Sequence, residues 1–412
     1  MSHPLFVGID IDTKKNTVCF LNSEGLKVIP SYAFSNNLSG AQSLLTYILN
    51  LMKTYSFDSV SIGGEATSVY SFHILNFFFF SKELSPFHPQ IYRFNPRLIA
   101  GFKKAYPDLP KTDDIDAFVI ADRLRFGRLP ANIKFNLQYL PLQKLTRARF
   151  HLVQTISREK NFFLTNLFLK FSNYITDTPF SDIFGATSST VITQLSPEEI
   201  ASMPIENLLS LLIEKSRNRF QQPLLIAQEL KKISKLAYPL PPQMKEAVDI
   251  VLLALLQNIR TMEAQLKKID QSIAKEISGI QHTLLSIQGI GPVFAAGIIA
   301  EIGDISCFKN QAALAKYIGL VWNKHQSGDF EAEDTYMSKH GNKYLRYYFI
   351  QAANTLHLHN SDFKKYYSRK YSESTKHHHK RALVLCARKL VRVIYCLLRS
   401  KKRYELPKTA NS

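Results

Sequence analysis

The sequence predicts an α/β domain at its amino-terminal end, followed by a mainly α-helical remainder. Within residues 1–130, short apolar runs typical of β-strands alternate with helical patterns. From residue 138 onward, apolar residues recur at intervals of three and four, the spacing of one face of an α-helix. With 412 residues, 45% of them hydrophobic, the chain is long enough for about two or three domains with cores of their own.

The amino-terminal domain is predicted to begin with three strands, a helix and a fourth strand. The strands have the sequences LFVGIDI, TVCFL, VIPSYAF and SVSIGGE, and the helix covers about 39–55. A helix over 72–80, a short strand near 91–94, and helices after Pro96 and Lys111 follow. This order of elements is that of a ribonuclease-H-like (RuvC-like) fold, and we expect the domain to end at Pro130.

The rest of the chain is predicted to form two helical regions, 138–280 and 281–404. The stretch 172–197 is rich in Ser, Thr and Pro and is expected to be a loop or an insertion. The stretch 243–277 has near-heptad apolar spacing, which either an antiparallel helical pair within the chain or a coiled coil between chains would produce. The oligomeric state, dimer to tetramer, is left open by this segment.

The net charge of +19 and the sequence pI near 9.6 favour a polyanionic partner, with nucleic acid preferred over an anionic membrane surface. No apolar run approaches the roughly 20 residues of a membrane span, and no signal peptide is recognised. The four cysteines have no spacing typical of a zinc site or a redox pair, which indicates reduced thiols and a cytoplasmic location.

Four acids stand where a ribonuclease-H-like fold gathers carboxylates around a divalent metal: Asp10, Glu65, Asp113 and Asp116. Asp10 and Glu65 each end a strand, and the other two are three residues apart, on one face of a helix. Phosphodiester chemistry with Mg²⁺ needs several converging oxygen ligands. Asp12 is a further candidate ligand, whereas Asp114 is expected to face elsewhere.

Any one of these acids also has an ordinary structural explanation. Asp113 and Asp114 would stabilise a helix N-terminus with Thr112 as its cap. Because closely spaced carboxylates repel each other unless a cation neutralises them, the metal is part of the hypothesis. Five lysines flank the acids and could hold phosphates: Lys14, Lys15, Lys103, Lys104 and Lys111.

Three features of the carboxy-terminal half indicate contact with DNA. The turn at 289–291 (GIG) is similar to that of a helix-hairpin-helix, although its small residues would equally suit close helix packing. Ser327, in HQSG, is a candidate nucleophile beside several cations, with a polar turn serine as the alternative. The segment 380–403 has nine Lys or Arg and no acid, and is predicted to be a basic amphipathic helix.

Taken together, these motifs resemble the DEDD transposases of the insertion sequence 110 family, which are related to the Piv and MooV invertases. The resemblance rests on GID, GGEAT and KTDDIDA, which contain the four acids, and on IQGIGPVFAAGIIAEIGDI, YIGL, HQSG and SKHGNKYLR. It implies a RuvC-like domain, a coiled coil, and a transposase domain whose nucleophile corresponds to Ser327.

The resemblance also implies a function and partners. The enzyme would cut and rejoin donor and target DNA through a phosphoserine intermediate, with Mg²⁺ at the four acids. It would work as a tetramer with a site composed from two subunits, guided by a bridge RNA. Two alternatives stay open: a RuvC-like junction resolvase or nuclease that uses metal-activated water, and a non-catalytic nucleic-acid-binding protein.

Overall fold

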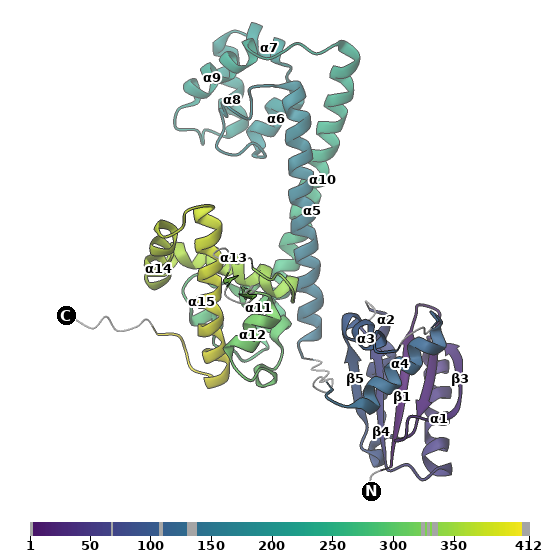
Figure 1. Ribbon diagram of the computed structural model, residues 1–412. Helices are drawn as coiled ribbons and strands as arrows, with labels where there is room; N and C mark the ends of the chain where they lie inside the picture. Colours follow the sequence, from purple (N-terminus) through teal and green to yellow (C-terminus); the bar gives the residue numbers. More distant parts are fainter. Residues whose placement is uncertain are drawn as a thin grey trace, which may run out of the picture. The chain divides into compact units, whose positions relative to one another are not determined.

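The computed structural model describes residues 3–66, 69–106, 110–129, 138–322, 326–327, 330–331 and 337–405. The chain divides into two compact units, 1–136 and 137–412 (Figure 1). The first holds the sheet and the second is almost entirely helical. An α/β amino-terminal part followed by a helical remainder, as predicted, is therefore confirmed.

Unit 1 is built on one five-stranded sheet. Strands β1 (Pro4–Ile11), β2 (Lys15–Leu21) and β3 (Lys27–Ser35) form an antiparallel meander, while β4 (Ser59–Glu65) and β5 (Gln90–Phe94) add to it in parallel. The strand order is β3-β2-β1-β4-β5, so β1 and β4 are neighbours at the centre. All five strands coincide with those that the apolar patterns predicted.

Helices cover both faces of this sheet. Helices α1 (Leu38–Thr54) and α2 (Tyr70–Phe80) pack on one face, over a core that includes Leu5, Val7 and Ile62. Helix α4 (Asp113–Phe126) packs on the other face, and α3 (Pro96–Lys103) lies against α4. β1 comes so close to α4 that a Cβ added at Gly8 would stand 2.3 Å from the Ala117 carbonyl oxygen.

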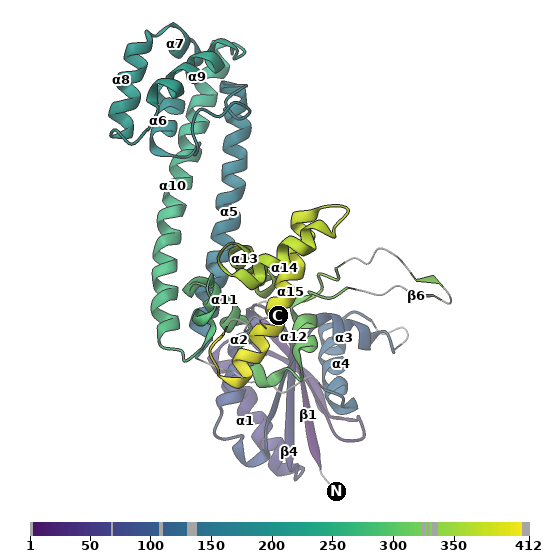
Figure 2. The ribbon, with the colours of Figure 1, turned by 90° about the vertical axis from the view of Figure 1, so that its left-hand side faces the viewer.

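Unit 2 is organised around a long helical hairpin, α5 (Leu140–Lys170) and α10 (Pro242–Ser278) (Figures 1 and 2). Ion pairs connect the two helices, and their residue numbers increase along α5 while they decrease along α10: Arg149–Asp270, Lys160–Glu263 and Lys170–Asp249. The two helices are therefore antiparallel partners within one chain, which accounts for the near-heptad spacing of α10.

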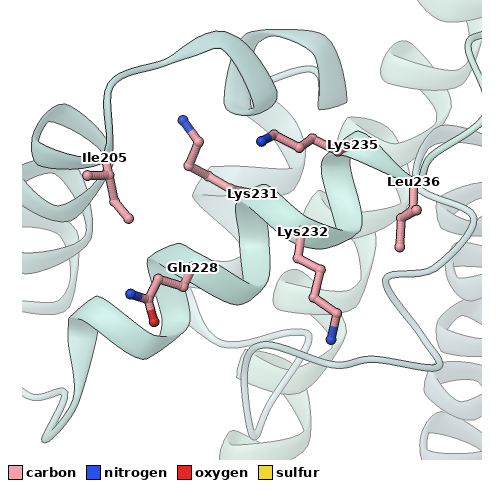
Figure 3. A pocket seen from close by; sticks show the side chains of 6 residues that line it. All are labelled: Ile205, Gln228, Lys231, Lys232, Lys235 and Leu236. Atoms are coloured by element: carbon pink, nitrogen blue, oxygen red, sulfur yellow. The ribbon is translucent and has the colours of Figure 1, made fainter.

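The segment between α5 and α10 folds as a small helical bundle of α6 (Ala186–Gln194), α7 (Pro197–Ser202), α8 (Ile205–Ser216) and α9 (Pro223–Lys235). The expectation of a loop over 172–197 was wrong for α6. Ser188 is buried there and its hydroxyl is bonded to the Tyr174 hydroxyl at 2.9 Å, so packing overrides low helix propensity. Figure 3 shows a pocket on this bundle, lined by Ile205, Gln228, Lys231, Lys232, Lys235 and Leu236.

The opposite end of the hairpin carries the second bundle of unit 2. Its helices are α11 (Pro292–Ile302), α12 (Gln311–Ile318), α13 (Lys343–His359), α14 (Ser361–Ser372) and α15 (His378–Ser400), with short 3-10 turns η2 (Leu284–Ser286) and η3 (Ile305–Cys307). Its core also takes in Leu142 of α5 and Ile273 of α10. In the described part of the chain, no helix combines the length and apolar character of a membrane span.

Candidate active site

Asp10 and Glu65 lie on the sheet face that α4 covers. The central strands pair in parallel with Ile9 opposite Gly64, so each acid is the next residue after a paired position. Side chains alternate along a strand, and Gly63, which shares the face of Glu65, stands against Leu124 of α4. Both carboxylates therefore leave the ends of adjacent strands on the same side of the sheet.

The first turn of α4 brings the other two acids to this face. Thr112 caps the helix, its hydroxyl accepting a hydrogen bond from the Ile115 amide at 3.4 Å. Asp113 and Asp116 follow within this turn, and the pair shares one side of the helix because three residues make most of a turn. The close packing of α4 on Gly8 sets how near this turn stands to β1.

The electrostatics of Asp10 and Glu65 reflect this arrangement. Burial, followed by the charges of Asp116 and Asp113, raises the pKa of Asp10 to about 6. Burial, followed by Asp10 and Asp116, also raises the pKa of Glu65, while Lys103 opposes the rise. Each of the four acids thus interacts electrostatically with at least one other, and their role as metal ligands stays a prediction.

A lysine side chain forms an ion pair with one of the four acids. Lys103, at the end of α3, donates from Nζ to Asp116 Oδ1 at 2.5 Å, and both side chains are about a quarter exposed. Lys103 is one of the five flanking lysines that the sequence analysis named, and the sequence gave no means of pairing it with a particular acid. The donor set is all carboxylate, which suits a hard divalent cation. Within the described residues, however, no three His, Cys, Asp or Glu groups are arranged to hold a metal ion. The four acids therefore lie close enough to shift one another's pKa, but they do not form a ligand set as they stand.

Asp12 and Asp114, which neighbour the four clustered acids in the sequence, are more exposed to solvent than Asp10 and Glu65. Asp12 is exposed, accepts a hydrogen bond from the Thr13 hydroxyl at 3.4 Å, and makes the smallest contribution to the raised pKa of Asp10. Asp114 is also exposed, and its charge acts on Cys19 of β2. Asp114 thus acts on the β2 side of the helix, and the expectation that it faces away from Asp10 and Glu65 stays a prediction.

The candidate nucleophile belongs to unit 2. Ser327 lies in the short strand β6 (Gln326–Ser327), paired with β7 (Phe330–Glu331), and its side chain lies outside the described residues. The stems of this loop are described: Trp322 bridges to Met337, and the Ser338 amide donates to the Val321 carbonyl at 2.8 Å.

A buried polar network that the sequence did not reveal lies beneath these stems. The Glu301 carboxylate of α11 accepts from Arg147 Nε at 2.6 Å, from Arg147 Nη2 at 2.9 Å, and from Asn342 Nδ2 at 2.7 Å. The Asn342 side-chain oxygen also caps α13, accepting from the amides of Tyr344 and Leu345. The sequence signal was weak, since Glu301 stands alone in the apolar run GIIAEI.

The glycines of the turn before α11 and the glycine within α11 have different surroundings. Gly289 has a φ of +102°, and Gly291 is the N-cap of α11 with open space where a Cβ would lie, so the turn is accessible. Gly297, by contrast, faces the Tyr348 ring at 2.4 Å from an added Cβ and serves close packing. The segment before the turn is the 3-10 turn η2 and not an α-helix.

Two family models match the chain. One, a DEDD transposase model of the IS110 type described as "Transposase", matches residues 7–171, and the other, "Transposase IS116/IS110/IS902 family", matches residues 281–368. The chain belongs to the IS110 family of transposases. The region matched by the first model, 7–171, contains all four acids and Arg147. The region matched by the second, 281–368, contains Glu301, Ser327 and Asn342.

Curated relatives align over part of their length. A probable family 20 transposase of Pseudomonas aeruginosa is 33% identical over 118 residues, 28% of this chain and 33% of the relative. The transposase for insertion sequence element IS1111A of Coxiella burnetii is 31% identical over 202 residues, 47% of this chain and 51% of the relative. The chain thus spans about a third to a half of the length of these relatives.

Proposed function

We propose that the protein is the transposase of an insertion sequence, which cuts and rejoins DNA. The observation that carries the proposal is the gathering of Asp10, Glu65, Asp113 and Asp116 on one face of the sheet, in a chain of the IS110 family. The strand order β3-β2-β1-β4-β5, with only β2 antiparallel to β1, supports a ribonuclease-H-like (RuvC-like) domain.

The four carboxylates are the residues that would hold Mg²⁺. A bound divalent cation there would supply charge stabilisation to a phosphate undergoing displacement. The chain's own contribution is to present oxygens from two strands and one helix turn, and to keep Lys103 at the edge of the set. The raised pKa values of Asp10 and Glu65 support the proposal, because a cation would relieve the repulsion that helps to raise them.

Ser327 is the proposed nucleophile. Its hydroxyl oxygen would form a bond to a DNA phosphorus while a bridging phosphorus–oxygen bond of the strand breaks. The serine proton leaves as the leaving oxygen takes one up, so the step conserves atoms and charge. Rejoining is the reverse reaction with a different strand end. The resemblance to the IS110 family supports a site shared between subunits of a tetramer, and guidance by a bridge RNA.

The charge distribution of unit 2 supports a nucleic-acid partner at its carboxy-terminal end. Residues 361–381, which comprise α14 and the start of α15, have seven Lys or Arg against two acids, a net charge of +5. Most of these cations are exposed, and Tyr371 beside them is 45% exposed. The inserted bundle, 172–244, has six Lys or Arg against seven acids. Polyanion binding is therefore expected at α14 and not at α9.

The test uses the full chain with a plasmid that carries the native element. Wild type is expected to form a covalent protein–DNA adduct that withstands denaturation, and Ser327→Ala to form none while it still binds DNA. Asp116→Asn should also abolish cleavage, with Asp114→Asn as the matched control on the same helix turn. Normal cleavage by Ser327→Ala would favour the resolvase alternative, and no cleavage by wild type would favour the non-catalytic binding protein.

A further inference from the structure

We infer that Glu301 is a positioning residue that fixes both stems of the loop carrying Ser327. The inference rests on the proposed function for its catalytic consequence. Glu301 does not contact the loop itself. It acts through Asn342, which begins α13 at the point where the second stem ends.

The carboxylate of Glu301 is fully buried, which makes its placement costly. Its side chain is 0% exposed, whereas that of Arg147 is 39% exposed. Both carboxylate oxygens are used: one faces Arg147 Nε, and the other accepts from Arg147 Nη2 and Asn342 Nδ2. A buried ion pair of this kind adds little net stability compared with apolar side chains of the same volume. Its value is geometric, because a bidentate arginine fixes the direction of the carboxylate.

Asn342, held by the Glu301 carboxylate, connects the second stem to the end of α12, where the first stem begins. Its side-chain oxygen caps α13. Its backbone amide donates to the Tyr317 carbonyl at 2.8 Å, which ties the second stem to the end of α12. Arg346, one turn into α13, donates from Nη1 to the Ile318 and Lys339 carbonyls at 2.9 Å. The two chain segments that lead into and out of the loop are thus held by one cluster of hydrogen bonds.

The network also joins the two parts of the chain that match separate family models. Arg147 belongs to α5, 154 residues before Glu301, and Asn342 follows Glu301 by 41 residues. The Arg147 guanidinium also lies 4.7 Å from the centre of the Tyr344 ring. The position of the loop stems is therefore set jointly by the long hairpin and by α11.

The test compares Glu301→Gln with Asp270→Asn in the full-length protein. The control breaks a second ion pair of α5, Arg149–Asp270, which does not touch the stems. Glu301→Gln is expected to speed amide hydrogen exchange at Ser338 and Asn342. It should also slow covalent adduct formation by on the order of 10- to 100-fold, with DNA affinity within about twofold of wild type. The control should leave amide exchange at the stems, the rate of adduct formation and DNA affinity unchanged.

A double variant, Arg147→Met with Glu301→Leu, keeps the test decisive if Glu301→Gln fails to fold. It should be at least as stable as wild type yet show the same loss of adduct formation. Unchanged exchange at both amides, or adduct formation at the wild-type rate by either variant, would overturn the inference. If wild type itself forms no adduct, the proposed function fails, and the exchange measurement alone decides whether Glu301 fixes the stems.

Discussion

Lys103 Nζ lies 2.5 Å from Asp116 Oδ1, so one of the four clustered acids is already paired with a cation from the protein itself. A positive group at this place lowers the repulsion within the cluster. It also competes with any divalent cation for the same carboxylate. The pair is partly exposed, and solvent screening limits its strength.

Replacement of Lys103 by methionine is expected to tighten divalent metal binding. Removing the competing charge should lower the Kd for Mg²⁺ or Mn²⁺ by about fivefold, equivalent to about 1 kcal/mol. Isothermal titration would measure this change. Lys104→Met, at the exposed neighbouring position, is the control and should leave the affinity unaltered. Equal affinities in wild type and Lys103→Met would show that the ammonium does not compete with metal.

In metal-free protein, the contribution of Asp10 to stability should become less favourable as the pH rises from about 4 to 6. The folded-state pKa of Asp10, about 6, exceeds its ordinary value of 3.8, so in this window the folded state holds a proton that the unfolded chain has lost. The contribution of Asp10 to the free energy of unfolding therefore falls with increasing pH, and the penalty is fully present well above pH 6. Since Asp10 is only partly buried, we expect a contribution of about 1 kcal/mol after solvent screening.

Asp10→Asn should remove this penalty. In EDTA at pH 7.5 the variant is expected to unfold at a higher urea concentration than wild type, and at pH 4 the two should coincide. Asp114→Asn should follow wild type at both values, because Asp114 is exposed and is expected to face away from the cluster. A variant that is less stable than wild type at pH 7.5 would contradict the assigned direction of the pKa shift.

The fold was predictable from the sequence where local pattern and tertiary packing agree. The five strands and helix α4 were found because apolar periodicity and the Thr112 cap are local signals. Helix α6 was missed because its Ser and Thr residues favour loops, whereas the burial of Thr187, Ser188 and Ser189 in the bundle favours the helix. The four acids could be named from their order along the chain. Glu301 could not, because its partners are 154 and 41 residues away and no local pattern links them.

The basic surface of α14 should contribute to nucleic-acid affinity, whereas that of α9 should not. Lys364→Gln with Lys365→Gln removes two exposed cations from the +5 segment. The dependence of log K on log salt for duplex DNA should become less steep by about 1.8, because each lost phosphate contact contributes about 0.9. Fluorescence anisotropy at several salt concentrations would measure this slope.

The matched control for that prediction is the pair Lys232→Gln and Lys235→Gln, at the pocket of the inserted bundle (Figure 3). Both lysines are exposed, as the α14 pair is, but their surroundings are balanced in charge. The control should bind DNA with the wild-type slope. A larger loss in the control than in the α14 variant would place the main nucleic-acid contact on the inserted bundle instead.

Gly8 links the packing of unit 1 to the geometry of the acids. A Cβ at Gly8 would lie 2.3 Å from both the Ala117 carbonyl oxygen and the Ala121 amide nitrogen, which are backbone atoms of α4. Gly8→Ala therefore has to push α4 away from β1, at a cost of about 1–3 kcal/mol. The same movement carries Asp113 and Asp116 away from Asp10, so Mg²⁺ affinity should fall together with stability.

Gly101→Ala provides the comparison, because no atom lies within 4 Å of an added Cβ at that position in α3. Alanine there should leave metal affinity unchanged and raise stability by about 0.5–1 kcal/mol through its higher helix propensity. Urea unfolding and metal titration on both variants would separate the two effects. If Gly8→Ala lowered stability but bound Mg²⁺ as wild type does, the separation between α4 and β1 would not control the acids, and the cluster would have to be held by the Lys103–Asp116 pair instead.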